Sequence, residues 1–90
     1  MKISILLAVY NGEKYIRQSI ESILDQTYED FELLIGLNGT TDNSRQIAKS
    51  FRKKDKRIKV FDYGRDKGKP KTLNKLLKKA SGEWIAIQDD

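Results

Sequence analysis

Residues 3–9 read ISILLAV, and the three residues after them, 10–12, read YNG. The first stretch is almost continuously apolar, which is typical of a β-strand with both faces buried. The Asn-Gly pair is a common breaker of regular structure, so it ends the strand. A strand buried on both faces needs a covering layer on each side, and this predicts a sheet flanked by helices.

Apolar residues continue this alternation along the chain. Three further apolar runs predict strands at residues 31–37, 58–61 and 84–87. Apolar residues at helical spacing predict three helices. The first covers residues 13–26, the second is marked by Ile47, Ala48 and Phe51 and runs to about Lys54, and the third runs from Pro70 to Ala80. The resulting βαβαβαβ order predicts an α/β fold, with a three-layer α/β/α, Rossmann-like parallel sheet in a single domain, residues 1–90.

Polar clusters follow each of the four predicted strands. They are Tyr10-Asn11, Asn38-Gly39, the loop 63–69 and Asp89-Asp90. Right-handed crossovers bring the carboxyl ends of parallel strands to one edge of the sheet. We therefore expect these clusters to converge at that edge and to form the functional site.

The inventory of side chains limits the chemistry of that site. The chain has no cysteine and no histidine, so a disulfide frame, a thiolate metal site and an imidazole base are excluded within it. Any metal must be held by oxygen atoms, and the carboxylates of Asp89 and Asp90 suit Mg²⁺ or Mn²⁺. Such an ion can neutralise a diphosphate leaving group. An acidic pair after a strand can equally cap a turn or a helix, so both interpretations stay open.

Two other loops offer polar groups without a phosphate-binding signature. In residues 38–42, which read NGTTD, Asn38 can hydrogen-bond a base or ribose, although a capped helix start explains the segment equally well. In residues 64–69, which read GRDKGK, the lysines can meet a diphosphate or lie in solvent. The chain contains neither a Walker-type nor a GxGxxG pattern, which argues against a P-loop hydrolase and a standard dinucleotide fold.

Charge is unevenly distributed along the chain. The net charge is +5, but residues 45–79 carry fifteen basic and three acidic side chains. Solvated helix faces explain this excess, as does attraction of an anionic ligand or an anionic membrane surface. No nucleic-acid-reading motif is present and aromatic residues do not alternate with the basic ones, so nucleic acid is not an expected partner.

The N-terminus gives an expectation about location. No apolar run approaches the ~20 residues that a membrane helix needs. The short apolar run after Met1-Lys2 lacks the cleavage pattern of a signal peptide. We therefore expect a mature cytoplasmic chain, which its basic stretch would bring to the inner face of the membrane.

The chain contains four sequence motifs in an order that is typical of one protein family. They are ISILLAVYN at 3–11 with SILDQTY at 22–28, FELLI at 31–35 with GTTDNS at 39–44, DKG at 66–68 with Asn74, and ASGEWIAIQD at 80–89. Together they cover nearly the whole chain, which resembles the N-terminal part of the family 2 glycosyltransferases. The resemblance implies the N-terminal half of a GT-A fold, and inverting transfer of a sugar from a nucleotide donor, often a UDP-sugar, to an acceptor hydroxyl.

The resemblance also implies roles for individual residues. By position, the nucleotide-binding residues are Ala8, Val9, Tyr10, Glu13, Asn38, Gly68, Lys71 and Asp89, and the metal-binding residues are Asp89 and Asp90. Mn²⁺ or Mg²⁺ is the implied cofactor, and a saccharide or lipid-linked acceptor is the implied second substrate. The family's catalytic base and the second acid of its Asp-x-Asp motif would follow residue 90, so we expect these 90 residues alone to be inactive in transfer.

Three short segments differ from the usual sequence of the family. They are Ala8-Val9 in place of Pro-Thr, Leu37-Asn38 in place of Asp-Asp, and Thr72-Leu73-Asn74 in place of Ala-Arg-Asn. The second change removes a carboxylate that contacts the nucleotide, so one contact that favours uracil is lost. The third removes a cation, for which Lys69, Lys71 or Lys75 can substitute.

Two other functions fit parts of the sequence. A nucleotidyltransferase would share the strand-end site, but it would normally carry a glycine-rich basic loop after the first strand. A basic, non-enzymatic module would bind anionic lipid or nucleic acid in a strongly salt-dependent way.

The last predicted strand also suggests self-association. Residues 84–88 are expected to expose an unpaired apolar edge, because the resemblance implies that this strand is internal in a complete GT-A sheet. Exposed edges recruit further strands, and this predicts a homodimer formed by sheet extension or exchange of an element.

Overall fold

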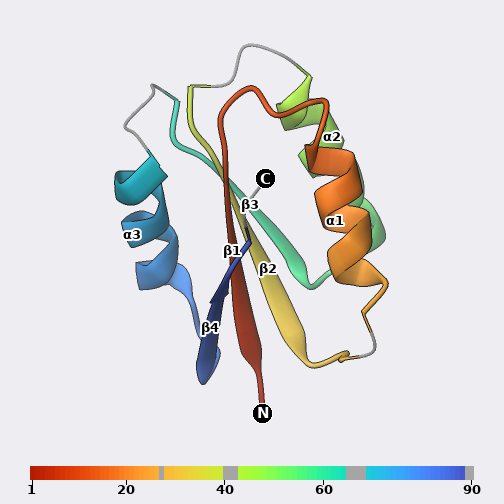
Figure 1. Cartoon of the computed structure of the whole chain (residues 1–90), viewed down its shortest axis with the longest axis vertical. Helices are drawn as coiled ribbons and strands as arrows, with labels where there is room; N and C mark the ends of the chain where they lie inside the picture. Colours follow the sequence, from red (N-terminus) through yellow and green to blue (C-terminus); the bar gives the residue numbers. More distant parts are fainter. Residues whose placement is uncertain (27, 40–42, 65–68, 89–90) are drawn as a thin grey trace.

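The computed structural model describes residues 1–26, 28–39, 43–64 and 69–88. Its elements follow the predicted order (Figure 1): β1 (Ile3–Val9), α1 (Ile16–Leu24), β2 (Phe31–Leu37), α2 (Ser44–Lys54), β3 (Ile58–Asp62), α3 (Lys69–Lys79) and β4 (Trp84–Ile87). Within these ranges, no helix has the length and apolar character needed to cross a bilayer. The βαβαβαβ pattern predicted from the sequence is therefore confirmed.

The strands form one parallel sheet in the order β3-β2-β1-β4. β1 and β2 pair along their whole length, whereas β4 pairs only with residues 3–6 of β1. After β1 the chain builds β2 and β3 on one side, and it then crosses to the other side of β1 to form β4. The strand order therefore reverses between β1 and β4, and open α/β sheets bind ligands outside the carboxyl ends of the strands at such a point.

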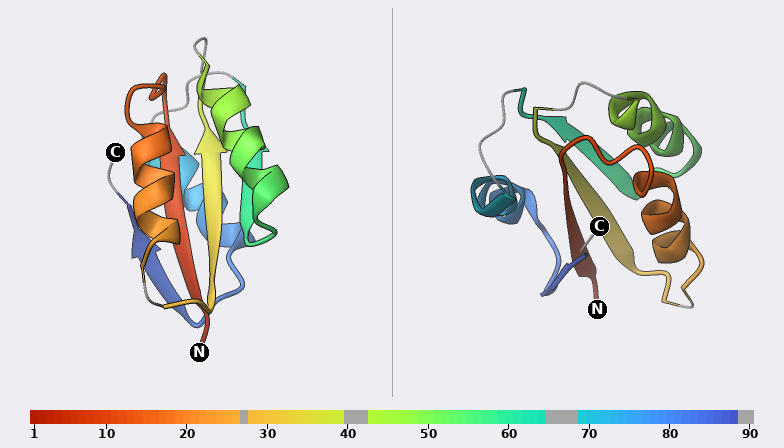
Figure 2. Two further views of the ribbon diagram at one scale, coloured as in Figure 1. Left: turned by 90° about the vertical axis from the view of Figure 1, so that its right-hand side faces the viewer. Right: turned by 45° about the horizontal axis from the view of Figure 1, so that its top comes forward.

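Helices cover both faces of the sheet (Figures 1 and 2). α1 and α2 lie on one face, where the larger core contains Leu7 of β1 and Ile20 of α1, both fully buried. α3 lies on the other face, where Leu6 and Leu34 pack against Leu76. Successive strand residues point to opposite faces, so an almost continuously apolar strand feeds both cores. The three-layer α/β/α arrangement is confirmed.

β4 is the strand with the least cover. Trp84, Ile85 and Ile87 are 57%, 43% and 58% exposed. In the part of the chain that the structure describes, β1 is the only strand that pairs with it. The exposed apolar edge expected over residues 84–88 is therefore present.

Candidate functional site

Loops from neighbouring strands meet at the carboxyl edge of the sheet. Tyr10 follows β1 and Asn38 follows β2, and the amide nitrogen of Asn38 donates to the carbonyl oxygen of Val9 at 2.9 Å. Beyond β2, the amide of Tyr63 donates to the carbonyl oxygen of Leu37 at 2.8 Å. These bonds extend the sheet past its strands, so three of the four predicted polar clusters adjoin one another.

The loop between β1 and α1 is a tight turn. Asn11 has a φ of +48°, in the left-handed region that few residues other than glycine occupy. The carbonyl oxygen of Gly12 accepts hydrogen bonds from the amides of Tyr15 at 2.9 Å and Ile16 at 2.7 Å. The helix predicted to start at Glu13 therefore starts at Ile16, because the turn uses the residues of its expected first turn.

Glu13 connects this loop to the start of α2. Its Oε1 lies 3.5 Å from the amide nitrogen of Asn43, and its Oε2 lies 3.5 Å from Asn43 Nδ2. A carboxylate is favoured there because the first turn of a helix carries partial positive charge. This role of Asn43 could not be predicted from the sequence, because 30 residues separate it from Glu13 and no local pattern marks the contact.

The predicted nucleotide-binding residues near β1 and β2 differ in exposure. Tyr10 is 55% exposed, so its ring is accessible to a planar ligand. Asn38 is 3% exposed, and Gly39 after it has a φ of +65°, which allows the sharp turn expected there. Ala8 and Val9 are buried, and the side chain of Val9 packs in the core beneath α1 and α2. Of these four residues, only Tyr10 presents a large side-chain surface to solvent.

The other predicted nucleotide-binding residues lie farther along the chain. Lys71 is exposed on the first turn of α3, which covers the face opposite α1. Gly68 and Asp89 lie outside the described residues. The structure therefore places Lys71 on a different layer from Glu13 and leaves the predicted diphosphate contacts as expectations.

The predicted metal ligands, Asp89 and Asp90, follow β4 and also lie outside the described residues. Within the described ranges, no three acidic side chains form a group that could hold a metal ion. The amide of Gln88, immediately before the pair, donates to the carbonyl oxygen of Leu6 at 2.9 Å, so the chain is paired with β1 up to that residue. Two consecutive carboxylates are hard oxygen donors, and this donor set fits Mg²⁺ or Mn²⁺.

Part of the basic stretch over residues 45–79 makes contacts within the fold. Arg45 Nε lies 2.6 Å from Asp62 Oδ2, and this bond, with one from the amide of Gly64, holds the pKa of Asp62 below its usual value. Lys75 Nζ lies 4.8 Å from the ring centroid of Tyr63. Because α2 and α3 lie on opposite faces of the sheet (Figure 2), the basic side chains are divided between two surfaces.

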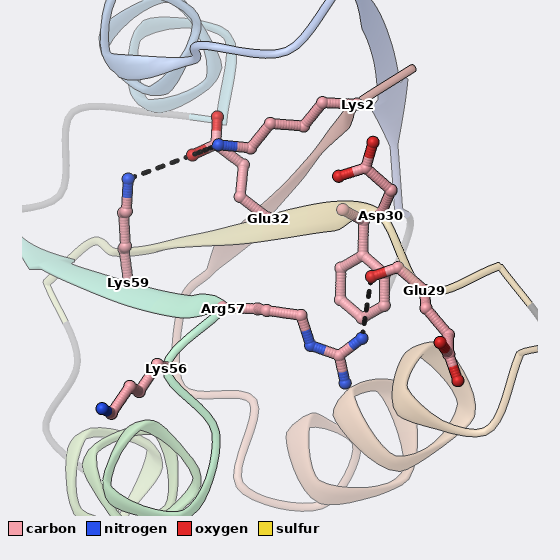
Figure 3. A pocket seen from close by; sticks show the side chains of 8 residues that line it. Lys2, Glu29, Asp30, Glu32, Lys56, Arg57 and Lys59 are labelled. Atoms are coloured by element: carbon pink, nitrogen blue, oxygen red, sulfur yellow. Dashed lines mark hydrogen bonds and ion pairs between the residues drawn. The ribbon is translucent and has the colours of Figure 1, made fainter.

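A hollow of about 310 Å³ lies at the opposite, amino-terminal edge of the sheet (Figure 3). Its lining consists of Lys2, Glu29, Asp30, Phe31, Glu32, Lys56, Arg57 and Lys59. Lys59 Nζ lies 3.1 Å from Glu32 Oε1, and the guanidinium of Arg57 lies 4.2 Å from the ring centroid of Phe31. These groups partner one another, and the hollow lies at the other edge of the sheet from the predicted site, so it is not part of that site.

Comparison with known proteins matches almost the whole chain. The model of "Glycosyl transferase family 2" matches residues 4–90. An uncharacterized glycosyltransferase of Haemophilus influenzae is 40% identical over 87 residues, which cover 97% of this chain and 35% of that protein. Glycosyltransferase GlyG of Streptococcus pneumoniae is 36% identical, with coverage of 97% and 29%. The chain thus spans about a third of the length of these relatives.

Two solved structures share the fold. S. aureus TarS in complex with UDP-GlcNAc has a TM-score of 0.88 and 33% identity, and the match covers 97% of this chain and 26% of TarS. The mannosyltransferase PcManGT from Pyrobaculum calidifontis, in complex with GDP-Man and Mn²⁺, has a TM-score of 0.85, with coverage of 92% and 25%. At 20% identity this second likeness shows the fold alone. Both comparisons confirm the predicted fold class.

Proposed function

Because the chain belongs to glycosyl transferase family 2, we propose that its single domain, residues 1–90, is the donor-binding half of a GT-A glycosyltransferase. A nucleotide-diphosphate sugar binds at the carboxyl edge of the sheet, beside the point where the strand order reverses. The observation that carries this proposal is the hydrogen bond from the Asn38 amide to Val9, because it holds the loops of Tyr10 and Asn38 together at that edge.

The residues around these two loops suit a nucleoside. The exposed ring of Tyr10 stacks on the base. Asn38, at the end of β2, is assigned to the base or the ribose, since an asparagine carries both donor and acceptor atoms. Glu13 and the strand end Ala8-Val9 are assigned to the same donor site. Small-molecule sites usually combine apolar side chains with a few polar groups.

The diphosphate end of the donor is assigned to the other predicted residues. Gly68 and Lys71 contact the diphosphate, and Asp89 and Asp90 hold Mn²⁺ or Mg²⁺. When bound, such an ion neutralises charge on the diphosphate leaving group. A UDP-sugar is the proposed donor, supported by the 33% identity to TarS, whose structure contains UDP-GlcNAc.

The transfer step is assigned to no side chain among these residues. The acceptor is a saccharide or a lipid-linked saccharide, and the base that activates its hydroxyl is supplied from outside residues 1–90. These residues alone therefore bind the donor without efficient transfer. We also propose a cytoplasmic location at the inner face of the membrane, supported by exposed lysines on one face of the domain, such as Lys78 on α3, which anionic lipid would attract.

An NMR titration of the chain with UDP-GlcNAc, GDP-mannose and a dTDP-sugar, each with Mg²⁺, tests the donor site. We expect UDP-GlcNAc to shift the amides of Tyr10 and Asn38 more than those at the opposite edge. Tyr10→Ala should weaken its binding by about tenfold, because stacking of a base on an aromatic ring contributes about 1–3 kcal/mol.

Tyr28→Ala is the matched control, since Tyr28 is an exposed tyrosine before β2, at the opposite edge of the sheet. It should bind UDP-GlcNAc as the unaltered chain does. If none of the nucleotides perturbed Tyr10 and Asn38, or if Tyr28→Ala weakened binding as much as Tyr10→Ala, the donor site would not be at this edge.

The open edge of β4 is the proposed homodimer contact. Two copies related by a twofold axis pair their β4 strands antiparallel, which brings the exposed Trp84, Ile85 and Ile87 of each copy together. Ile85→Lys should weaken dimerisation at least about tenfold, because burying an unpaired charge is costly. Leu77→Lys, an exposed apolar position on α3, is the control. A mass in sedimentation equilibrium that stays monomeric at every concentration would contradict this contact.

A further inference from the structure

The register of β4 on β1 is not set by packing of its side chains. All four residues of β4 are exposed, and the three large apolar ones, Trp84, Ile85 and Ile87, are between 43% and 58% exposed. In most strands a slip by one residue is prevented because it would move a buried apolar set to the solvent face. β4 has no buried set, so another feature must hold it in place.

That feature is a buried carboxylate on β2, at the entry to β4. Glu32 is 2% exposed and lies on the face that α3 covers. Its Oε2 accepts hydrogen bonds from Ser4 Oγ at 2.6 Å and from the amide of Ser81, two residues after the end of α3, at 2.7 Å. Lys59 Nζ lies 3.1 Å and Lys2 Nζ lies 3.6 Å from its Oε1, and Figure 3 shows both directed toward the carboxylate.

Ser4 links the Glu32 carboxylate to Gly82, the residue after Ser81. Its hydroxyl donates to Glu32 and accepts a hydrogen bond from the amide of Gly82 at 2.8 Å. The amide of Glu83 then donates to the carbonyl oxygen of Lys2 at 2.9 Å. The three consecutive amides of residues 81–83 thus bond to β2, to β1 and to Lys2 just before β1, ahead of the start of β4.

Gly82 adds a steric condition to these hydrogen bonds. A Cβ at this position would lie 2.6 Å from Ser4 Oγ, 2.8 Å from Ser4 N and 2.9 Å from the carbonyl oxygen of Lys2. Two of these atoms are backbone, so they cannot move without disturbing β1. A slip of β4 by one residue would bring Ser81 or Glu83, each with a Cβ, into this place. Only one register satisfies both the hydrogen bonds and the available space.

We propose that Glu32, acting through Ser4 and Gly82, is a positioning residue that fixes the register of β4 and thereby the position of Gln88, the residue before the proposed metal ligands. A slip of one residue moves a strand by about 3.3 Å. Metal–ligand distances tolerate only about 0.2 Å. The hydrogen bonds of Glu32 at the amino-terminal edge therefore determine where β4 ends at Gln88, and so where the chain enters the proposed metal site. Only this last step rests on the proposed function.

Hydrogen exchange followed by NMR in the unliganded chain tests the register. Ser4→Ala removes both bonds of the relay with little change in volume. We expect the amides of Glu83 and Gln88 to exchange at least about tenfold faster, because bonds to a carboxylate are among the strong ones. The amide of Asn38, bonded between β2 and β1, should exchange as before. Ser22→Ala, on the exposed side of α1, is the matched control and should change none of them.

An unchanged exchange rate at Glu83 and Gln88 in Ser4→Ala would overturn the anchor. So would an equal acceleration at all three amides, which would mean general destabilisation. Glu32→Gln gives a second test in a milder variant: it retains an oxygen acceptor for Ser81 but loses the charge, so β4 exchange should lie between that of the unaltered chain and Ser4→Ala.

Line broadening by added Mn²⁺ then separates this inference from the proposed metal site. In the unaltered chain we expect broadening centred on Gln88, the residue next to the proposed metal ligands, and in Ser4→Ala we expect at least about tenfold more Mn²⁺ to produce it. Equal broadening in both chains would overturn the positioning role. No broadening in the unaltered chain would remove the metal site, while the exchange data would still decide the register.

Discussion

Acidification from about pH 5 to about pH 2 should remove about 3 kcal/mol of unfolding free energy through Glu32 alone. Burial by itself would raise the pKa of this carboxyl. Hydrogen bonds from Ser4, Ser81 and Lys59 outweigh burial and lower the pKa from 4.5 to about 2. The unfolded chain therefore takes up this proton first as the pH falls. The stabilisation is complete above about pH 5 and is lost as the pH approaches 2.

Urea unfolding at pH 7, 5, 3 and 2 measures this effect. Glu32→Gln should be less stable than the unaltered chain at pH 7, and the two should converge near pH 2, because the neutral acid and the amide are then alike. Some dependence on pH should remain in Glu32→Gln, since hydrogen bonds from Arg57 and Arg45 lower the pKa of Asp55 and Asp62. Glu29→Gln, at an exposed position nearby, is the control. Parallel curves for Glu32→Gln and the unaltered chain would contradict this role of Glu32.

The strand positions could be predicted because both faces of the inner strands are buried. β1 and β2 are apolar along almost their whole length, and a short apolar run of this kind has few alternatives in an α/β protein. The start of α1 could not be predicted so closely. It depends on the positive φ of Asn11 and on the turn at Gly12, and the same sequence also suits a helix that starts at Glu13.

The position of the candidate site could also be predicted, because it follows from topology. Strand ends in a parallel sheet share one edge, so Tyr10 and Asn38 had to come together whatever their side chains. The Glu32 anchor could not be found in this way. A glutamate within a strand ordinarily faces solvent, and the partners of Glu32 are separated from it by 28 residues at Ser4 and 49 at Ser81.

The number of basic residues in 45–79 does not by itself show that they form one basic surface. Its fifteen cations lie close together in sequence, but ten of them belong to α2 and α3, which cover opposite faces, and the other five lie on β3 or in the connecting segments. Arg45 and Arg57 are paired with Asp62 and Asp55. A module that binds nucleic acid needs a continuous basic surface, so this distribution favours the transferase over that alternative.

Replacement of both Asp89 and Asp90 by asparagine should abolish the effect of Mn²⁺ on donor binding. We expect Mn²⁺ to tighten UDP binding to the unaltered chain and to change it little in Asp89→Asn/Asp90→Asn. The loss should exceed about tenfold, because changes even to the outer partners of metal ligands cost about 10–100-fold in affinity. Calorimetric titration with UDP, with and without Mn²⁺, measures both affinities.

Asp25→Asn, at an exposed position after α1, is the matched control for a lost carboxylate. It lowers the negative charge of the chain without touching the strand ends, so it should retain the full effect of Mn²⁺. If the double variant still responded to Mn²⁺, the ion would be held by the diphosphate or by other carboxylates. If UDP binding weakened equally with and without Mn²⁺, the pair would contact the nucleotide itself. Only a loss confined to the metal-containing titration identifies Asp89 and Asp90 as metal ligands.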